Sequence, residues 1–100
     1  MKPFKRYLAR HNPATDANQK GIVDNLRAIG ASVWPLSGKG IPDLLVGYRG
    51  DTFLLEVKID HHAQLRPAQK AFHESWRGGP IAVVTSFDEA CAAIGAKVSR

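Results

Sequence analysis

The stretch Gly40–Lys58, which reads GIPDLLVGYRGDTFLLEVK, constrains the fold of this chain more than any other segment. Apolar residues precede and follow the turn residues around Arg49 and Gly50, which is the pattern of a β-hairpin. If the turn is centred between those two residues, Asp43 on the first strand faces Glu56 on the second. The sequence therefore predicts a hairpin with one acidic residue on each arm.

Two carboxylates and an ammonium are expected to meet at one end of this hairpin. Glu56 and Lys58 share a face because strand side chains alternate, and the opposed residues Asp43 and Glu56 share one too, with Cβ atoms roughly 4.5–5.5 Å apart. Opposed like charges destabilise a half-buried sheet unless a cation lies between them, and a divalent metal with oxygen ligands is the natural candidate. The alternative is that Glu56 lies on a solvated strand face, but its apolar neighbours in the sequence argue against exposure.

The rest of the chain predicts an α-β-β-β-α-β order and a closing helix. Such an order, with the last strand reached through a helix, favours a mixed sheet with helices on both faces. The apolar spacing and the turn residues place strands over 32–36, 42–47, 52–58 and 80–85. They place helices over 16–29 and from Pro67 to about 77, and a last helix after the strand 80–85. Thr15 is the expected N-cap of the first helix, and Ser86 and Glu89 form the expected capping box of the last. The strand 80–85 is so apolar that we expect it to be buried on both sides.

Composition points to a single domain with a basic N-terminal arm. The chain has 100 residues and a formal net charge of +5. Four cations precede the first acidic residue, so we divide the chain into an arm over 1–14 and a domain over 15–100. The arm either contacts phosphates or is a solvated terminus. The single cysteine, Cys91, is expected in the core, and no apolar run is long enough to span a membrane or to serve as a signal peptide.

The hairpin motif is also where a family resemblance appears. Pro42-Asp43 followed by Glu56-Val57-Lys58 resembles the PD-(D/E)XK nuclease signature. The surrounding segments Asp16–Gln19 and Leu65–Gln69 make the chain similar to the virus-type replication-repair nuclease (VRR-NUC) domain of phages, from about Thr15 to Glu89. The resemblance implies the α/β fold of that superfamily, with an αβββαβ core.

The resemblance also implies roles for particular residues. Asp43 and Glu56 would bind Mg²⁺ or Mn²⁺ together with the backbone carbonyl of Val57, and Lys58 would act at the phosphate and the attacking water. Gln69 would hold a metal-bound water or orient Lys58, or it is an ordinary exposed helix residue. Asp16 would contact the metal directly or through water, although an acidic residue in a first helical turn also suits the helix dipole without any catalytic role.

The function implied is a metal-dependent DNA endonuclease that acts on branched or otherwise structured DNA. The alternative is a nucleic-acid-binding or structural subunit without catalysis. We expect a homodimer, with Trp34 and Trp76 as candidates for a shared surface, and a soluble protein of the cytoplasm of a bacterial or phage-infected cell. The candidate DNA contacts are Ser37 and Lys39 in the loop before Asp43, and Lys5, Arg6 and Arg10 in the arm.

Overall fold

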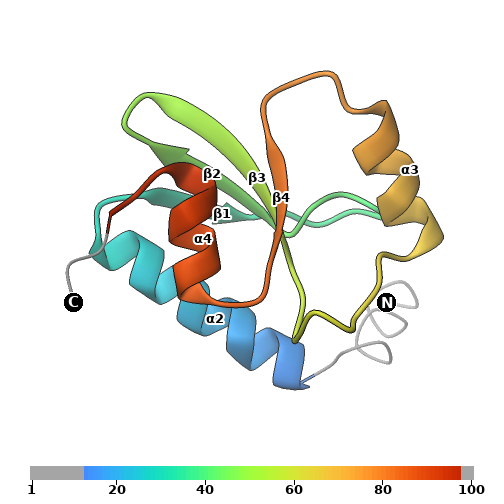
Figure 1. The fold of residues 1–100 in the computed structure, drawn as a ribbon, viewed down its shortest axis with the longest axis horizontal. Coiled ribbons are helices and arrows are strands. Elements are labelled where there is room, and N and C mark those ends of the chain that lie inside the picture. The colour runs from blue at the N-terminus through green and yellow to red at the C-terminus, as the bar shows by residue number, and fades with distance from the viewer. Residues whose placement is uncertain (1–12, 98–100) are drawn as a thin grey trace, which may run out of the picture.

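The computed structural model describes residues 13–97, so the cations of the arm lie outside the described residues. The predicted order of elements is confirmed, and a closing helix follows the last strand (Figure 1). The elements are α2 (Pro13–Ala28), β1 (Ser32–Pro35), β2 (Leu44–Tyr48), β3 (Asp51–Val57), α3 (Pro67–Ser75), β4 (Ile81–Val84) and α4 (Phe87–Ile94). The strands form one sheet in the order β1-β2-β3-β4, antiparallel except for the parallel pair β3 and β4. The fold is therefore the mixed α/β arrangement that the sequence predicts.

The hairpin of β2 and β3 has the predicted register. Leu45 pairs with Leu54, and Gly47 pairs with Thr52. Arg49 and Gly50 form the turn with positive φ angles of 50° and 87°. A two-residue turn with both φ angles positive matches the right-handed twist of the strands, which is why it fixes the register.

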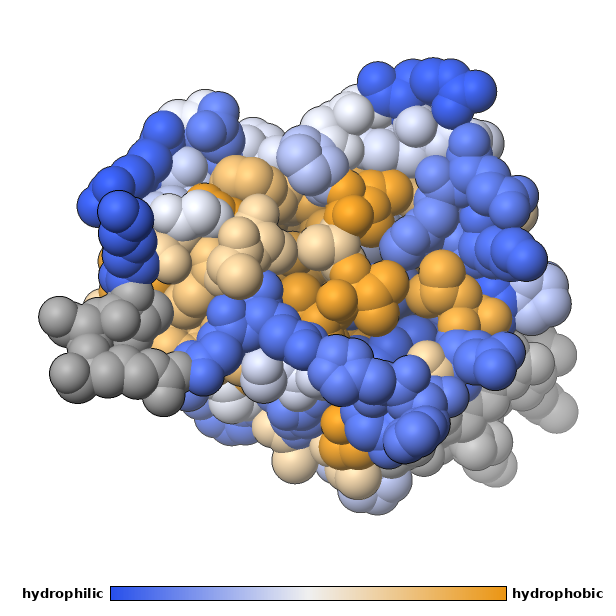
Figure 2. Space-filling view, in the orientation of Figure 1, coloured by the Kyte–Doolittle hydropathy of each residue, from blue (hydrophilic) through white to orange (hydrophobic). Residues whose placement is uncertain are grey.

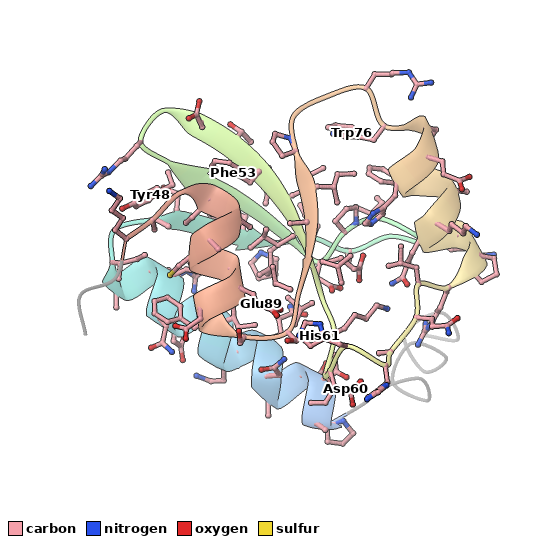
Figure 3. All side chains as sticks on the ribbon, viewed as in Figure 1. Tyr48, Phe53, Asp60, His61, Trp76 and Glu89 are labelled. Carbon is pink, nitrogen blue, oxygen red and sulfur yellow. The ribbon has the colours of Figure 1, made fainter. Side chains whose placement is uncertain are left out.

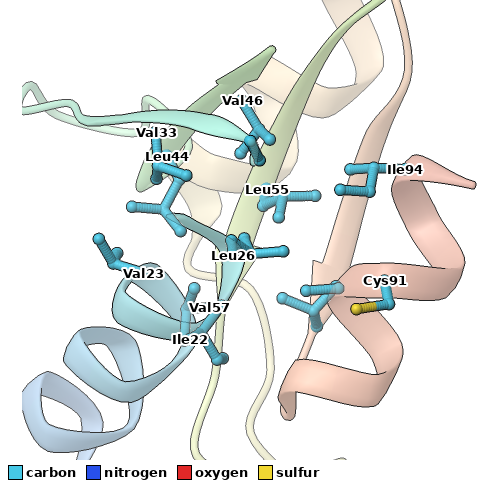
Figure 4. Close-up of a cluster of buried hydrophobic side chains, with 13 residues drawn as sticks. Ile22, Val23, Leu26, Val33, Leu44, Val46, Leu55, Val57, Cys91 and Ile94 are labelled. Atoms are coloured by element: carbon cyan, nitrogen blue, oxygen red, sulfur yellow. The ribbon is translucent and has the colours of Figure 1, made fainter. Parts of the chain in front are cut away.

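The core lies on one face of the sheet, beneath α2 and α4 (Figure 4). Each strand contributes alternate residues to this face, as the two-residue period of a strand requires. Cys91 of α4 is 3% exposed and belongs to the core, as predicted. The other central members of the cluster are Ile22, Val23, Leu26, Val33, Leu44, Val46, Leu55, Val57, Val84 and Ile94.

The second face of the sheet is only partly covered, which corrects one prediction. The strand over 80–85 was expected to be buried on both sides, but Val83 is 46% exposed. No residue of α3 is buried either, and Phe72 and Trp76 stack on each other with ring centroids 5.3 Å apart. Both follow from the position of α3, which lies to one side of β4 and does not lie flat on the sheet (Figure 1). Figure 2 accordingly shows apolar surface between α4 and α3.

The helix ends differ from the predictions in detail. α2 already begins at Pro13, so Thr15 lies inside the helix and the prediction of an N-cap there is wrong. Proline is well suited to a first helical turn because it needs no hydrogen-bond partner for its nitrogen. Ser86 caps α4 as predicted, with its Oγ accepting from the Glu89 N–H at 3.1 Å. The Glu89 carboxylate, however, accepts from the Thr85 N–H at 2.7 Å. No described helix is long and apolar enough to cross a membrane.

Gly40 brings the loop before β2 against the start of α3. Its φ is +80°, and a Cβ added there would lie 2.6 Å from the carbonyl oxygen of Ala68. Gly30 has a similar φ of +98°, but a Cβ there would meet no atom within 4 Å. Of these two glycines, only Gly40 is therefore required by close packing against backbone as well as by backbone conformation.

Replacing Gly40 with alanine should destabilise the protein more than replacing Gly30. Both changes carry the conformational cost of a side chain at positive φ, roughly 1 kcal/mol or more. Gly40→Ala adds a collision with backbone, so α3 must shift. Denaturant unfolding of both variants measures the difference, and equal losses in the free energy of unfolding would contradict the close packing described here.

Candidate active site

Asp43 is fixed against β3 by the backbone of the neighbouring strand. It follows the buried Pro42, and its carbonyl oxygen accepts from the Leu36 N–H at 2.8 Å. Its side-chain Oδ2 accepts from the Val57 N–H, also at 2.8 Å. That N–H belongs to the residue after Glu56. Asp43 is therefore held beside Glu56, which is the position that the sequence predicts.

Glu56 is the one charged residue that is buried among the described residues, with 1% of its surface exposed. Its Oε2 accepts from Gln69 Nε2 at 3.0 Å, whereas no N–H or hydroxyl of residues 13–97 donates to its buried Oε1. Burial, then a hydrogen bond to Asp43 and the charge of Asp43, raise the pKa of Glu56 from 4.5 to about 8, against the opposing charges of Lys58 and Arg66. A protonated Glu56 can share its proton with Asp43, which explains how two acids can be adjacent in the protein without a cation.

Gln69 links Glu56, the acidic residue of β3, to Lys58, the second residue after it. Its Oε1 accepts from Lys58 Nζ at 2.9 Å, and its Nε2 donates to Glu56. The same Oε1 accepts from the Arg66 N–H at 2.8 Å, so the amide is oriented by the first turn of its own helix. Asp43, Glu56, Lys58 and Gln69 therefore form one connected cluster.

His73, which the sequence analysis did not single out, is close enough to this cluster for the charge of Lys58 to act on it. It lies four residues after Gln69 on α3, which places both on the same side of the helix. Burial and the charge of Lys58 lower its pKa below 6.5, so it is neutral at pH 7. The spacing of Gln69 and His73 was a usable signal, but only once Gln69 was placed in the site.

The remaining candidates are more peripheral. Asp16 lies in the first turn of α2 and is exposed, and Ser37 and Lys39 are exposed in the loop between β1 and β2. Lys5, Arg6 and Arg10 lie outside the described residues. Within residues 13–97, no group of three or more His, Cys, Asp or Glu side chains could hold a metal ion.

The donor set at the hairpin nevertheless fits a hard divalent cation. It offers the carboxylates of Asp43 and Glu56, and the buried Oε1 of Glu56 accepts no hydrogen bond from residues 13–97. The carbonyl of Val57, the residue between Glu56 and Lys58, is a third candidate oxygen ligand. Mg²⁺ is commonly held by one or two carboxylates and completes its coordination with water, so a third acidic side chain is not required.

Comparison with known proteins places this geometry in a family. A solved structure described as "VRR_NUC domain" is 34% identical to this chain and superposes with a TM-score of 0.70. The match covers 82% of this chain and 95% of that chain. This chain belongs to the VRR-NUC family. No protein-family model matches the sequence, and no curated protein matches it.

Membership of the VRR-NUC family supports the general character of the site. It indicates a nuclease domain that acts on nucleic acid, and nucleases of this fold use divalent metals in general. The predicted family and the predicted αβββαβ fold are thus confirmed.

Proposed function

We propose that this VRR-NUC protein is a Mg²⁺- or Mn²⁺-dependent DNA endonuclease that hydrolyses phosphodiester bonds. The observation that carries the proposal is the buried Glu56, which lies beside Asp43 and is joined through Gln69 to the ammonium of Lys58. A buried carboxyl group with a pKa of about 8 and an oxygen without a donor is costly unless a ligand uses it. A divalent metal bound by its oxygens would repay that cost.

Each residue of the cluster has a distinct role in this proposal. Asp43, Glu56 and the Val57 carbonyl would hold the metal, and Asp16 would contact it directly or through water. The bound metal would acidify a water molecule and neutralise charge on the phosphate. Lys58 places its ammonium beside the phosphate and stabilises the negative charge that develops in the transition state. Gln69 keeps that ammonium in place and orients Glu56.

The DNA contacts come from parts of the chain that surround this cluster. The nine acidic residues of the chain all lie within 13–97, where they equal the lysines and arginines in number. A neutral domain attracts phosphates weakly, so we assign much of the backbone contact to Lys5, Arg6 and Arg10 of the arm, together with Ser37 and Lys39. The substrate we propose is branched or otherwise structured DNA, cut in the cytoplasm.

A cleavage assay on labelled DNA tests this function. The purified protein is incubated with duplex, flap and four-way junction substrates of matched length, with Mn²⁺, with Mg²⁺ and with chelator. We expect cleavage that needs the metal and is faster on a branched substrate. Binding without cleavage under every condition would favour the second candidate, a nucleic-acid-binding or structural subunit that has kept the fold.

We also propose that the protein acts as a homodimer through the open second face of the sheet. Trp34 is 67% exposed on the edge strand β1, and an apolar groove of about 210 Å³ lies between β3 and the segment from Trp76 to Pro80. A surface without charged lining residues suits another apolar surface better than it suits phosphates. Two copies would also supply the two sites that symmetric cutting of a junction needs.

Light scattering at micromolar concentration tests the dimer. We expect a mass about twice the 10.9 kDa of one chain, and a shift toward the monomer when Trp34 is replaced by a charged residue. A monomer mass in the wild-type protein, with and without DNA, would rule the dimer out and indicate a nuclease that cuts a single strand.

A further inference from the structure

One polar side chain of α2 reaches the end of the strand that carries the site. Asn18 Nδ2 donates to the carbonyl oxygen of Lys58 at 2.9 Å and to that of Thr85 at 3.1 Å. One amide group thereby donates to the residues directly after β3 and β4, which are far from Asn18 in the sequence. The side chain is partly buried, so these bonds are shielded from water.

The contact takes the place of a missing rung in the sheet. The parallel ladder between β3 and β4 continues as far as the bond from the Lys58 N–H to the Val84 carbonyl at 3.0 Å. In a longer parallel ladder, the Lys58 carbonyl would accept from the N–H of Ser86. β4 ends before that residue, because Ser86 is already the N-cap of α4. The amide of Asn18 supplies the donor that the ladder lacks.

The chain that leaves Lys58 is held at a second point as well. His61 Nε2 lies 2.7 Å from Glu89 Oε2, and Glu89 Oε1 accepts from both the N–H and the hydroxyl of Thr85. Figure 3 shows His61 and Glu89 close together where α4 begins. Thr85 is therefore fixed through its N–H, its hydroxyl and its carbonyl. The residue after β4 that accepts from the Asn18 amide is thus itself held by hydrogen bonds to α4.

We propose that Asn18 is a positioning residue for Lys58. It fixes the peptide group that follows Lys58, and so sets the direction from which the side chain reaches Gln69 and the reacting phosphate. This inference rests on the proposed nuclease function. We assign Asn18 no contact with metal or DNA. Its loss should therefore reduce the rate of the chemical step and leave the binding of both unchanged.

Four variants test the inference. Asn18→Ala removes the donor, and Asn18→Asp places carboxylate oxygens against two carbonyl oxygens. Asn25→Ala and Asn25→Asp make the same changes at an exposed asparagine of the same helix and serve as matched controls. Cleavage is measured as a single-turnover rate at saturating DNA and Mn²⁺, well below the Tm of each variant. The DNA concentration giving half-maximal rate and the Mn²⁺ affinity are measured alongside it.

We expect Asn18→Ala to lower the saturated rate by about 10- to 100-fold, because small displacements of a group that acts on the reacting centre have effects of this size. Asn18→Asp should lower it further, and both Asn25 variants should cut like the wild type. The DNA and Mn²⁺ affinities should change less than about twofold throughout. An unchanged rate in Asn18→Ala, or a loss fully explained by weaker metal binding or a smaller folded fraction, would overturn the inference.

Failure of the nuclease function itself would look different, because the wild-type protein would not cut. The contact of Asn18 can then be tested by hydrogen exchange at the Lys58 N–H, the last rung of the ladder. Exchange should be faster in Asn18→Ala than in Asn25→Ala. Equal exchange in the two variants would show that Asn18 does not hold the end of β3.

Discussion

Replacing Glu56 with glutamine is expected to abolish cleavage and, at high pH, to make the metal-free protein more stable than the wild type. Glutamine is neutral, keeps an oxygen that accepts from Gln69, and offers hydrogens to Asp43. It therefore reproduces the protonated form of Glu56, which is the form that burial favours. The metal loses a charged ligand, while the packing changes little.

The direction of the pH effect follows from the raised pKa. The folded protein keeps a proton on Glu56 up to about pH 8, whereas the unfolded chain releases it near 4.5. The wild-type protein should therefore lose stability as pH rises from 4.5 to 8, with no further loss from this group above that pH. The glutamine variant lacks this loss. Its advantage should be absent below pH 4.5 and largest above pH 8, at most about 5 kcal/mol and less if the site relaxes.

Thermal unfolding from pH 5 to 9 in the presence of chelator measures this advantage, and Glu74→Gln on the exposed side of α3 is the matched control.

Mn²⁺ must displace the proton from Glu56, so its apparent affinity for the wild-type protein should rise with pH up to about 8. A glutamine variant that retains more than about a tenth of the wild-type rate would remove Glu56 from the proposed mechanism. A stability difference that does not vary with pH would show that Glu56 is ionised in the metal-free protein.

Replacing Lys58 with alanine is expected to reduce cleavage at least about 100-fold while leaving a functional metal site. The ammonium donates to Gln69 and is not a metal ligand in this proposal. Its charge does, however, lower the pKa of Glu56, so its removal should make that carboxyl group harder to ionise. Mn²⁺ binding by the variant should therefore be weaker at pH 7 and should recover at pH 9.

A second measurement on Lys58→Ala does not depend on activity. The charge of Lys58 also lowers the pKa of His73, so this pKa should rise in the variant when it is followed by NMR. Lys70→Ala, an exposed lysine of α3, is the control and should change neither cleavage nor the His73 titration. Loss of Mn²⁺ binding by Lys58→Ala at every pH would contradict the role given to the lysine.

The hairpin and its acidic pair were predictable because local rules determine them. A two-residue turn fixes the register, the register fixes which residues oppose each other, and strand periodicity fixes the shared face. Asp43, Glu56 and Lys58 therefore follow from sequence alone, and the resemblance adds Gln69 from the next helix. The closeness of Gln69 to the other three depends on how α3 is placed, which no local pattern describes.

Other features depend on tertiary placement and were missed. The apolar sequence of β4 predicts burial on both sides, but whether the outer side is covered depends on where α3 lies. Asn18 did leave a signal that was not used. It precedes the buried Ile22 and Leu26 at four-residue intervals, so a polar side chain stands in line with the buried stripe of α2. Such a residue needs a partner, and here the partners are the ends of two strands.

The absence of buried residues on α3 has a consequence for the dynamics of the protein. Nine residues are too few for a helix to be stable in water without tertiary contacts, and the apolar contacts of α3 are few. The bonds of Gln69 to Glu56 and Lys58 are therefore among its main attachments to the sheet. Local opening of α3 would break them together, so the helix and the site should open and close as one cooperative unit of low stability. Any ligand that tightens the carboxylate cluster would also slow that opening.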